Sequence, residues 1–203
     1  VDLTTGLPVE IKVKNDLTLS WSAEWDKEGK NIFYTINNQI LKLNIDSGEE
    51  MILYNGKRLN VPILTRSSDG KSLLFDDLEN IDDEGLSLCH LLKIPEFGGE
   101  AKIMYTYNSE QNWRFKRFAL SPEGKYVYFT ALDSALKSIL YRIPAAGGTP
   151  EIIWQQPKDF FFAGISIHPE GKKIALSVNK PGIEIRVIEN LGRKVTEIYS
   201  KNE

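Results

Sequence analysis

The stretch that decides the fold is LSPEGKYVYFT, residues 120–130, which reads as a tight turn between two strands. Pro122 fixes φ for the first turn position, Glu123 favours the turn, and Gly124 supplies a positive φ. The flanking residues are mostly β-branched, aromatic or aliphatic, as strands require. The stretch therefore predicts a β-hairpin centred on a Glu-Gly-Lys turn.

The same turn occurs four times along the chain. The aligned segments are DKEGKNIFYT (26–35), SSDGKSLLFD (67–76), SPEGKYVYFT (121–130) and HPEGKKIALS (168–177). Their glycines are separated by 41, 54 and 47 residues. A repeat of this length is the first feature that a fold prediction has to explain.

A second turn follows each of the first ones. The segments are IDSGEEMILY (45–54), PEFGGEAKIMY (95–105), PAAGGTPEIIW (144–154) and ENLGRKVTEIY (189–199), and each ends in an apolar strand closed by Tyr or Trp. Each unit thus predicts four short strands, which in the third unit are residues 114–120, 125–131, 139–143 and 151–154. No stretch shows a convincing helical period. Four-stranded units of roughly 40–50 residues are typical of propeller blades.

The apolar strand, the Ser-Pro-(Asp/Glu)-Gly-Lys turn and the later Gly-Gly turn together resemble the TolB-type β-propeller repeat. The resemblance covers essentially the whole chain, and the third unit matches fully, whereas the fourth has His168 where Ser is usual. The same repeat occurs in propeller domains of prolyl-oligopeptidase-like peptidases and of tricorn protease. The resemblance implies an all-β fold: a β-propeller with four four-stranded antiparallel blades and an N-terminal partial blade.

The domain organisation follows from the repeat. We expect one blade each in residues 15–55, 56–106, 107–155 and 156–203, and the end of a preceding blade in residues 1–14. Because an uncovered blade exposes apolar surface and strand edges, we expect this to be the C-terminal part of a longer propeller. Two alternatives remain: self-association of two halves into a larger ring, and a four-blade ring completed by the amino-terminal strands.

Composition excludes several classes of function. The net charge is −3 with no basic stripe, so nucleic-acid binding is not expected. No apolar run approaches the roughly 20 residues of a membrane helix, so we expect no membrane insertion. The lone Cys89 excludes an internal disulfide and a multi-thiolate metal site. The residues leave the compartment open; resemblance to TolB favours the bacterial periplasm, although similar repeats occur fused to cytoplasmic signalling domains.

The two rims of such a propeller should differ. The turns between strands one and two and between strands three and four lie on one edge, the turn rim, and are short. The other connections lie on the opposite edge, the loop rim, and vary: residues 55–62, 76–85, 106–115 and 155–162. Variable loops on a rigid scaffold usually carry binding. We therefore expect a protein or peptide partner at the loop rim.

Aromatic residues and Arg supply most of the binding energy at interfaces. The predicted contact residues on the loop rim are Trp113, Arg114, Phe160, Phe161 and Arg58. The alternative, that the aromatic ones begin the innermost strands and pack between blades, stays open. We expect Phe162, Trp21 and Trp25 to be packing residues.

The segment 76–85 is rich in carboxylates, which are ligands for Ca²⁺. Its spacing matches no EF-hand, and we expect a solvated loop, with Asp82, Asp83 and Glu84 as weak metal candidates only. We expect no cofactor.

Groups for catalysis are few. His90 follows Cys89 in an apolar strand, where neighbours point to opposite faces, so the two should not form a nucleophilic pair. His168 should make a local backbone hydrogen bond in place of the usual Ser. The sequence has no nucleophile elbow, phosphate loop or His-Glu-x-x-His motif. It predicts a non-catalytic scaffold; the alternatives are a gating propeller domain of a larger peptidase-like enzyme and a small-molecule-binding propeller.

Overall fold

Strands and the turns between them make up the whole described part of the chain. The computed structural model describes residues 22–56, 64–80, 87–109, 117–132, 138–155, 161–180 and 182–189. These ranges contain no helix, and hence none with the length and apolar character to cross a membrane. The all-β prediction is confirmed.

The strands form four antiparallel sheets, which we call blades 1 to 4. In each, the order of strands across the sheet is their order along the chain. Blade 1 comprises β1 (Ala23–Trp25), β2 (Asn31–Ile36), β3 (Gln39–Asn44) and β4 (Glu50–Asn55); blade 2 comprises β5 (Thr65–Arg66), β6 (Ser72–Asn80), β7 (Ser87–Pro95) and β8 (Lys102–Ser109). Blade 3 comprises β9 (Arg117–Leu120), β10 (Tyr126–Leu132), β11 (Ser138–Pro144) and β12 (Glu151–Gln155); blade 4 comprises β13 (Phe161–Ile167), β14 (Lys173–Lys180) and β15 (Gly182–Glu189).

These strands agree closely with the predicted ones. The four strands expected in the third unit correspond to β9–β12, whose bounds differ by at most three residues. The fourth strand expected in the last unit lies almost wholly outside the described residues. The blade boundaries given above stay a prediction.

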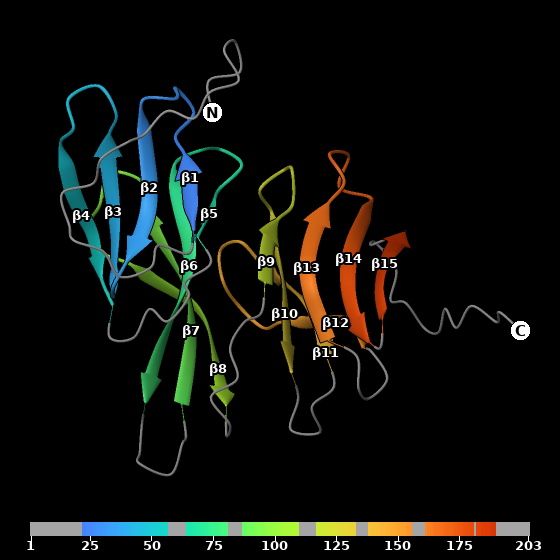
Figure 1. Ribbon diagram of the computed structural model, residues 1–203. Helices are drawn as coiled ribbons and strands as arrows, with labels where there is room; N and C mark the ends of the chain where they lie inside the picture. Colours follow the sequence, from blue (N-terminus) through green and yellow to red (C-terminus); the bar gives the residue numbers. More distant parts are fainter. Residues whose placement is uncertain are drawn as a thin grey trace, which may run out of the picture.

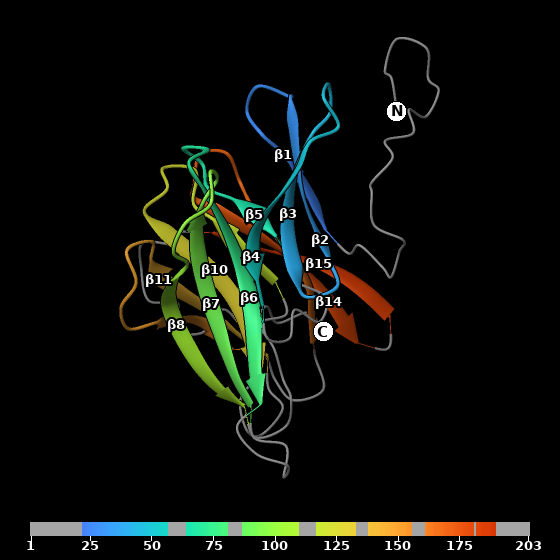
Figure 2. The ribbon, with the colours of Figure 1, turned by 90° about the vertical axis from the view of Figure 1, so that its left-hand side faces the viewer.

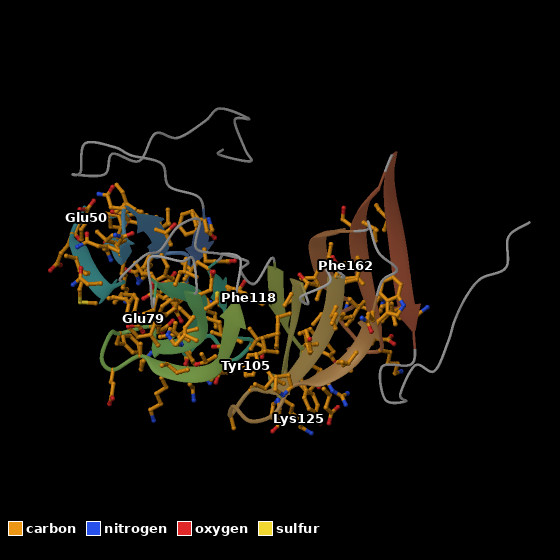
Figure 3. The ribbon with its side chains drawn as sticks, turned by 90° about the horizontal axis from the view of Figure 1, so that it is seen from below. Glu50, Glu79, Tyr105, Phe118, Lys125 and Phe162 are labelled. Atoms are coloured by element: carbon orange, nitrogen blue, oxygen red, sulfur yellow. The ribbon has the colours of Figure 1, made fainter. Side chains whose placement is uncertain are left out.

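The four blades follow one another around an open arc. Blades 1 and 4 lie at its two ends, and the turn rim is at the top of Figure 1. Figure 3, which looks onto the loop rim, shows the same curved succession of sheets. In Figure 2 the sheets are splayed, with β14 and β15 running at an angle to β3. Each inner blade is therefore covered on both faces by a neighbour.

The first turn of each blade is built by the same backbone geometry. The turn glycine of blade 3, Gly124, has φ 70°, and the other three have φ between 68° and 71°. The amide of Gly124 donates to the carbonyl of Ser121 at 2.9 Å. A positive φ of this kind costs an L side chain about 1–2 kcal/mol, which explains the Gly at this position.

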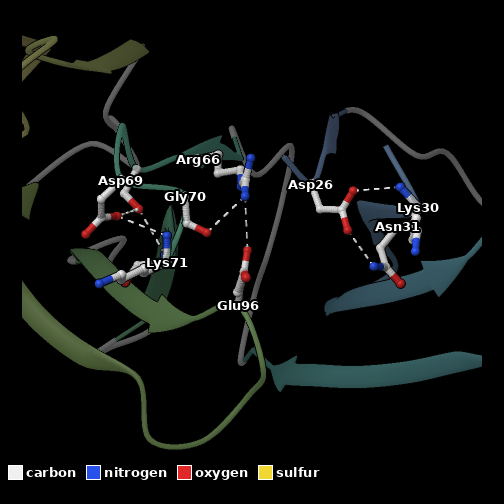
Figure 4. Close-up of polar contacts among 10 residues, drawn as sticks. Asp26, Lys30, Asn31, Arg66, Asp69, Gly70, Lys71 and Glu96 are labelled. Carbon is white, nitrogen blue, oxygen red and sulfur yellow. Dashed lines mark hydrogen bonds and ion pairs between the residues drawn. The ribbon is translucent and has the colours of Figure 1, made fainter. Parts of the chain in front are cut away.

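The residue that opens the turn caps it with a side-chain acceptor. Ser121 Oγ accepts from the amides of Lys125 (3.1 Å) and Tyr126 (3.0 Å). In blade 1, Asp26 takes this place and accepts from the Lys30 amide at 2.8 Å (Figure 4). In blade 4 the amide of Glu170 donates to His168 Nδ1 at 3.2 Å, which confirms the local hydrogen bond predicted for this His.

The two turns of a blade are bonded to each other. The amides of Ile45, Glu96 and Ala145 in the second turns donate to carbonyls of the first turns at 2.8 to 3.0 Å. In blade 2, Arg66 Nη2 adds contacts to the Gly70 carbonyl (3.0 Å) and to Glu96 Oε2 (3.3 Å; Figure 4). In blades 1, 2 and 3 the first and second turns are thus joined by a backbone hydrogen bond.

A bulge explains the aromatic end of the three described fourth strands, β4, β8 and β12. The pairing of the third and fourth strands shifts at Leu41, at Leu92 and at Tyr141, the same position in three blades. After the bulge two successive residues face the next blade. These pairs are Leu53 with Tyr54, Met104 with Tyr105, and Ile153 with Trp154, and all six belong to inter-blade clusters.

The hydrophobic core lies between the sheets. The first cluster joins blades 1 and 2, the second joins blades 2 and 3, and the third joins blades 3 and 4. Phe162 is buried in the third cluster with its ring centroid 5.4 Å from that of Trp154, so its predicted packing role is confirmed. Apolar area removed from water, at about 25 cal/mol per Å², is what holds neighbouring blades together.

One packing prediction is wrong. Trp25 is 50% exposed, because it is the last residue of the short edge strand β1 and pairs with Ile32 where the turn begins. Trp21 lies outside the described residues.

The cap of blade 3 gives a test of the turn. Ser121→Ala removes the buried acceptor of two amides, so we expect a loss of about 1–2 kcal/mol in the free energy of unfolding. Ser68→Ala, at an exposed turn position of blade 2, is the control and should change it by less than about 0.5 kcal/mol. Urea unfolding followed by tryptophan fluorescence measures both. If both variants lost the same free energy of unfolding, the Ser121 cap would stabilise the protein no more than an exposed turn residue does.

Candidate functional site

The predicted contact residues mostly fall outside the described part of the chain. This holds for Trp113, Arg114, Phe160 and Arg58, and also for the weak metal candidates Asp82, Asp83 and Glu84. Phe161 opens β13, where the structure describes its backbone pairing with Asn179. The binding site therefore stays a prediction. The structure describes only the strand ends that the predicted contact segments connect.

Blade 2 extends furthest on the loop rim. Strands β6 and β7 have 9 residues and β8 has 8, whereas β2, β3 and β4 have 6 each. The turn ends are held in one position by their hydrogen bonds, so the extra length projects at the loop rim, as Figure 1 shows. Polar side chains of this extension meet the end of blade 1.

The expectation of a solvated acidic loop beginning at Asp76 is wrong. Asp76, Asp77 and Glu79 belong to β6, and the first two are only 4% and 5% exposed. The physical reason is that both carboxylates lie within a fully paired strand, where they have hydrogen-bonding or electrostatic partners. The remaining part of the acidic segment lies outside the described residues.

Asp77 is held across the junction of blades 1 and 2. Tyr54 Oη donates to Asp77 Oδ2 at 2.8 Å, and the Leu78 amide donates to Asp77 Oδ1 at 2.9 Å. The Tyr54 ring packs on Phe75 with centroids 4.7 Å apart. Burial, followed by the hydrogen bond to Asp77 and its negative charge, raises the pKa of Tyr54. The hydroxyl therefore remains a donor at physiological pH.

His90 stands opposite Asp77 on β7, on the face toward blade 1. Its Nδ1 lies 3.0 Å from Thr106 Oγ1, and its Nε2 lies 3.4 Å from Glu79 Oε2. Cys89 is buried in the cluster between blades 2 and 3, on the other face. The prediction that Cys89 and His90 point apart is confirmed.

We call Tyr54, Asp77, Glu79, His90 and Thr106 the junction cluster. Within the described ranges no three His, Cys, Asp or Glu side chains gather to hold a metal ion. The cluster offers acceptor oxygens and one imidazole at the rim, and Glu79, which is more exposed than His90, lies between blades 1 and 2 in Figure 3. This chemistry suits hydrogen bonding to a cationic or amide group of a partner.

Sequence reasoning missed the junction cluster. Tyr54 and Asp77 are 23 residues apart and belong to different blades, so no local pattern joins them. The available signal was Leu78, an apolar residue that extends the apolar run of residues 73–75 past the two Asp.

Comparison with solved structures shows the fold. The β-propeller domain of Cps50 (Swd1) from Myceliophteria thermophila is similar with a TM-score of 0.58 and 16% identity, over 83% of this chain and 50% of that chain. Dipeptidyl peptidase 4 of Porphyromonas gingivalis is similar with a TM-score of 0.60 and 13% identity, over 91% and 33%. A protein assigned as TolB from Agrobacterium tumefaciens has a TM-score of 0.44 and 13% identity, over 86% and 78%.

The β-propeller fold is therefore confirmed, as the TolB-type repeat implied. No protein-family model and no curated protein matches the chain. The chain spans half or less of the Cps50 and peptidase chains. One of these is an enzyme by name and the other a propeller domain, so their likeness indicates a scaffold and no particular activity.

The junction cluster makes a prediction about pH. The pKa of Tyr54 is raised in the folded state above its ordinary value of 10.0, so its stabilising effect is fully present below pH 10 and is lost as the pH rises further. Tyr54→Phe should lower the free energy of unfolding at pH 8 by about 1–3 kcal/mol, because buried Asp77 loses a donor.

The variant should also lose stability less steeply than the wild type above pH 10, by up to about 1.4 kcal/mol per pH unit. Urea unfolding of both proteins at pH 8, 10 and 11 measures this, and the titration of lysines cancels in the comparison. If the free energy of unfolding fell equally with pH in both proteins, the raised pKa of Tyr54 would be contradicted.

Proposed function

We propose that the chain is a non-catalytic β-propeller scaffold that binds a protein or peptide partner through its loop rim. The observation that carries this proposal is the contrast between the rims. On the turn rim, backbone hydrogen bonds join the turns of each blade in the same way three times over. On the loop rim, strands of different length end beside one another and present a polar cluster between two blades.

Chain connectivity supports the choice of contact residues. Arg58 follows β4, which ends one residue after Tyr54, and Trp113 and Arg114 follow β8, which carries Thr106. Phe160 precedes β13 in the sequence, and Phe161 is the first residue of that strand. Each connection begins or ends on the loop rim, so the aromatic and cationic residues leave the same edge on which Glu79 and His90 lie. Aromatic residues and Arg are enriched at protein-binding surfaces and supply most of the hot-spot energy there.

A second candidate is a gating propeller domain within a larger peptidase-like enzyme. It is favoured by the similarity to dipeptidyl peptidase 4, of which this chain matches 33%. A hydrolase domain in the same reading frame would support it, and its absence from the complete reading frame would remove it.

The binding proposal is tested with peptides selected from a phage-displayed random library on the immobilised chain. Trp113→Ala and Arg114→Ala should each lower the affinity for the selected peptide by about 30-fold, which corresponds to about 2 kcal/mol of binding free energy at a hot spot. Isothermal titration calorimetry measures the affinity, and circular dichroism shows that the variants fold.

The matched control is Phe97→Ala. Phe97 is an aromatic residue on the turn rim with 72% of its surface exposed, so its removal tests nonspecific aromatic binding. Peptide affinity should stay within twofold of the wild type. If Phe97→Ala weakens the peptide while both loop-rim variants bind normally, the wrong rim has been chosen.

A further inference from the structure

Blade 4 presents an uncovered sheet face at one end of the arc. On β15, Ile185 and Val187 are 77% and 57% exposed. They pair with Ser177 and Ala175 of β14 and so share one face with them. The opposite face carries Ile174, Leu176 and Val178 in the cluster with blade 3.

The repeat shows what this face is built for. Position for position in the strand pairing, Ile185 corresponds to Ile40, Leu91 and Leu140, which pair with Thr35, Asp76 and Thr130. All three counterparts are 0% exposed, because the following blade covers them. The face of blade 4 therefore continues the series of three inter-blade interfaces, and within the described residues no following blade covers it.

The other end of the arc is already covered. The outward face of blade 1 carries Tyr34, Ile36, Leu41 and Leu43, which are between 1% and 5% exposed. Two copies joined head to tail would need an open face at both ends. The described residues leave one inter-blade face open, and a single open face fits a symmetric contact, in which the same patch is used by both copies.

The shape of the patch suits such a contact. Small residues, Gly164, Ala175 and Ser177, lie on β13 and β14, and the two large aliphatic residues form a ridge on β15. In a two-fold arrangement, the ridge of one copy lies over the small residues of the other, and the reverse contact follows by symmetry.

We propose that blade 4 is a dimerisation surface, at which a second copy of this chain packs its own β15 ridge against Gly164, Ala175 and Ser177. The contact closes after two copies, because each copy uses the one inter-blade face that is open in the described part of the chain. This surface is separate from the loop rim, so peptide binding there and dimerisation here can fail independently.

Multi-angle light scattering of the purified chain, over a hundredfold range of concentration, tests the proposal. The wild type should have twice the monomer mass, and Ile185→Glu with Val187→Glu should have the monomer mass. The control is Ile152→Glu on β12, where the Ile is similarly exposed (54%) but lies on another blade, and it should remain a dimer. Circular dichroism shows that all variants fold.

Cross-linking then tests the symmetric geometry. The chain has one Cys, and Cys89 is buried, so an introduced thiol reacts selectively. A mixture of Ile185→Cys and Ala175→Cys chains should form a linked pair with a short bis-maleimide, and a mixture of Ile152→Cys and Ala175→Cys should not.

Three results would overturn the proposal. A wild type that stays monomeric at every concentration leaves the face for a different occupant, such as a further blade of a longer polypeptide. A mass that keeps growing indicates open-ended association. A dimer that survives the double Glu variant uses another surface.

Discussion

Each sheet of this protein is apolar on both faces, and this constraint governs the rest of the structure. Leu91 and Leu92 are successive residues of β7, yet one is buried against blade 3 and the other against blade 1. A strand with no solvated face cannot belong to an isolated sheet. Stability is therefore shared between neighbours, as in other repeat architectures. The burial of apolar side chains between two blades stabilises both sheets and holds the second in position relative to the first.

The turn rim and the loop rim divide two tasks. Hydrogen bonds between the first and second turns fix one end of the sheet in blades 1, 2 and 3, and Arg66 adds a side-chain link in blade 2. Because that end is fixed, any added strand length projects at the other end. Blade 2 uses it to bring Asp77 and His90 against blade 1, where Tyr54 supplies a donor. The hydrogen bonds on the turn rim thus help to set the positions of Asp77, His90 and Tyr54 on the loop rim.

Much of the fold could be predicted from the sequence because its signals are local. The glycine of the turn, the acceptor that caps it and the Tyr or Trp that ends each fourth strand all lie within one unit. The junction cluster could not be predicted, because its members meet only when two blades pack. Asp76 and Asp77 resemble the start of a loop when their partners are unknown, and a Trp before a turn resembles a core residue until the short strand that carries it is placed.

The bulge in the fourth strands of blades 1, 2 and 3 has a consequence for evolution by duplication. Because of the bulge, each of these blades presents an aliphatic residue or Met and then an aromatic residue to the following blade. A blade that is duplicated or deleted therefore leaves a neighbour with the same kind of interface. The curvature of the assembly is then a sum of many small angles, each decided by local side-chain volume, and no single residue encodes how many units complete a circle. Closure of a ring therefore depends on all of the inter-blade angles together. A small deviation repeated at every interface adds up at the contact between the first and the last blade.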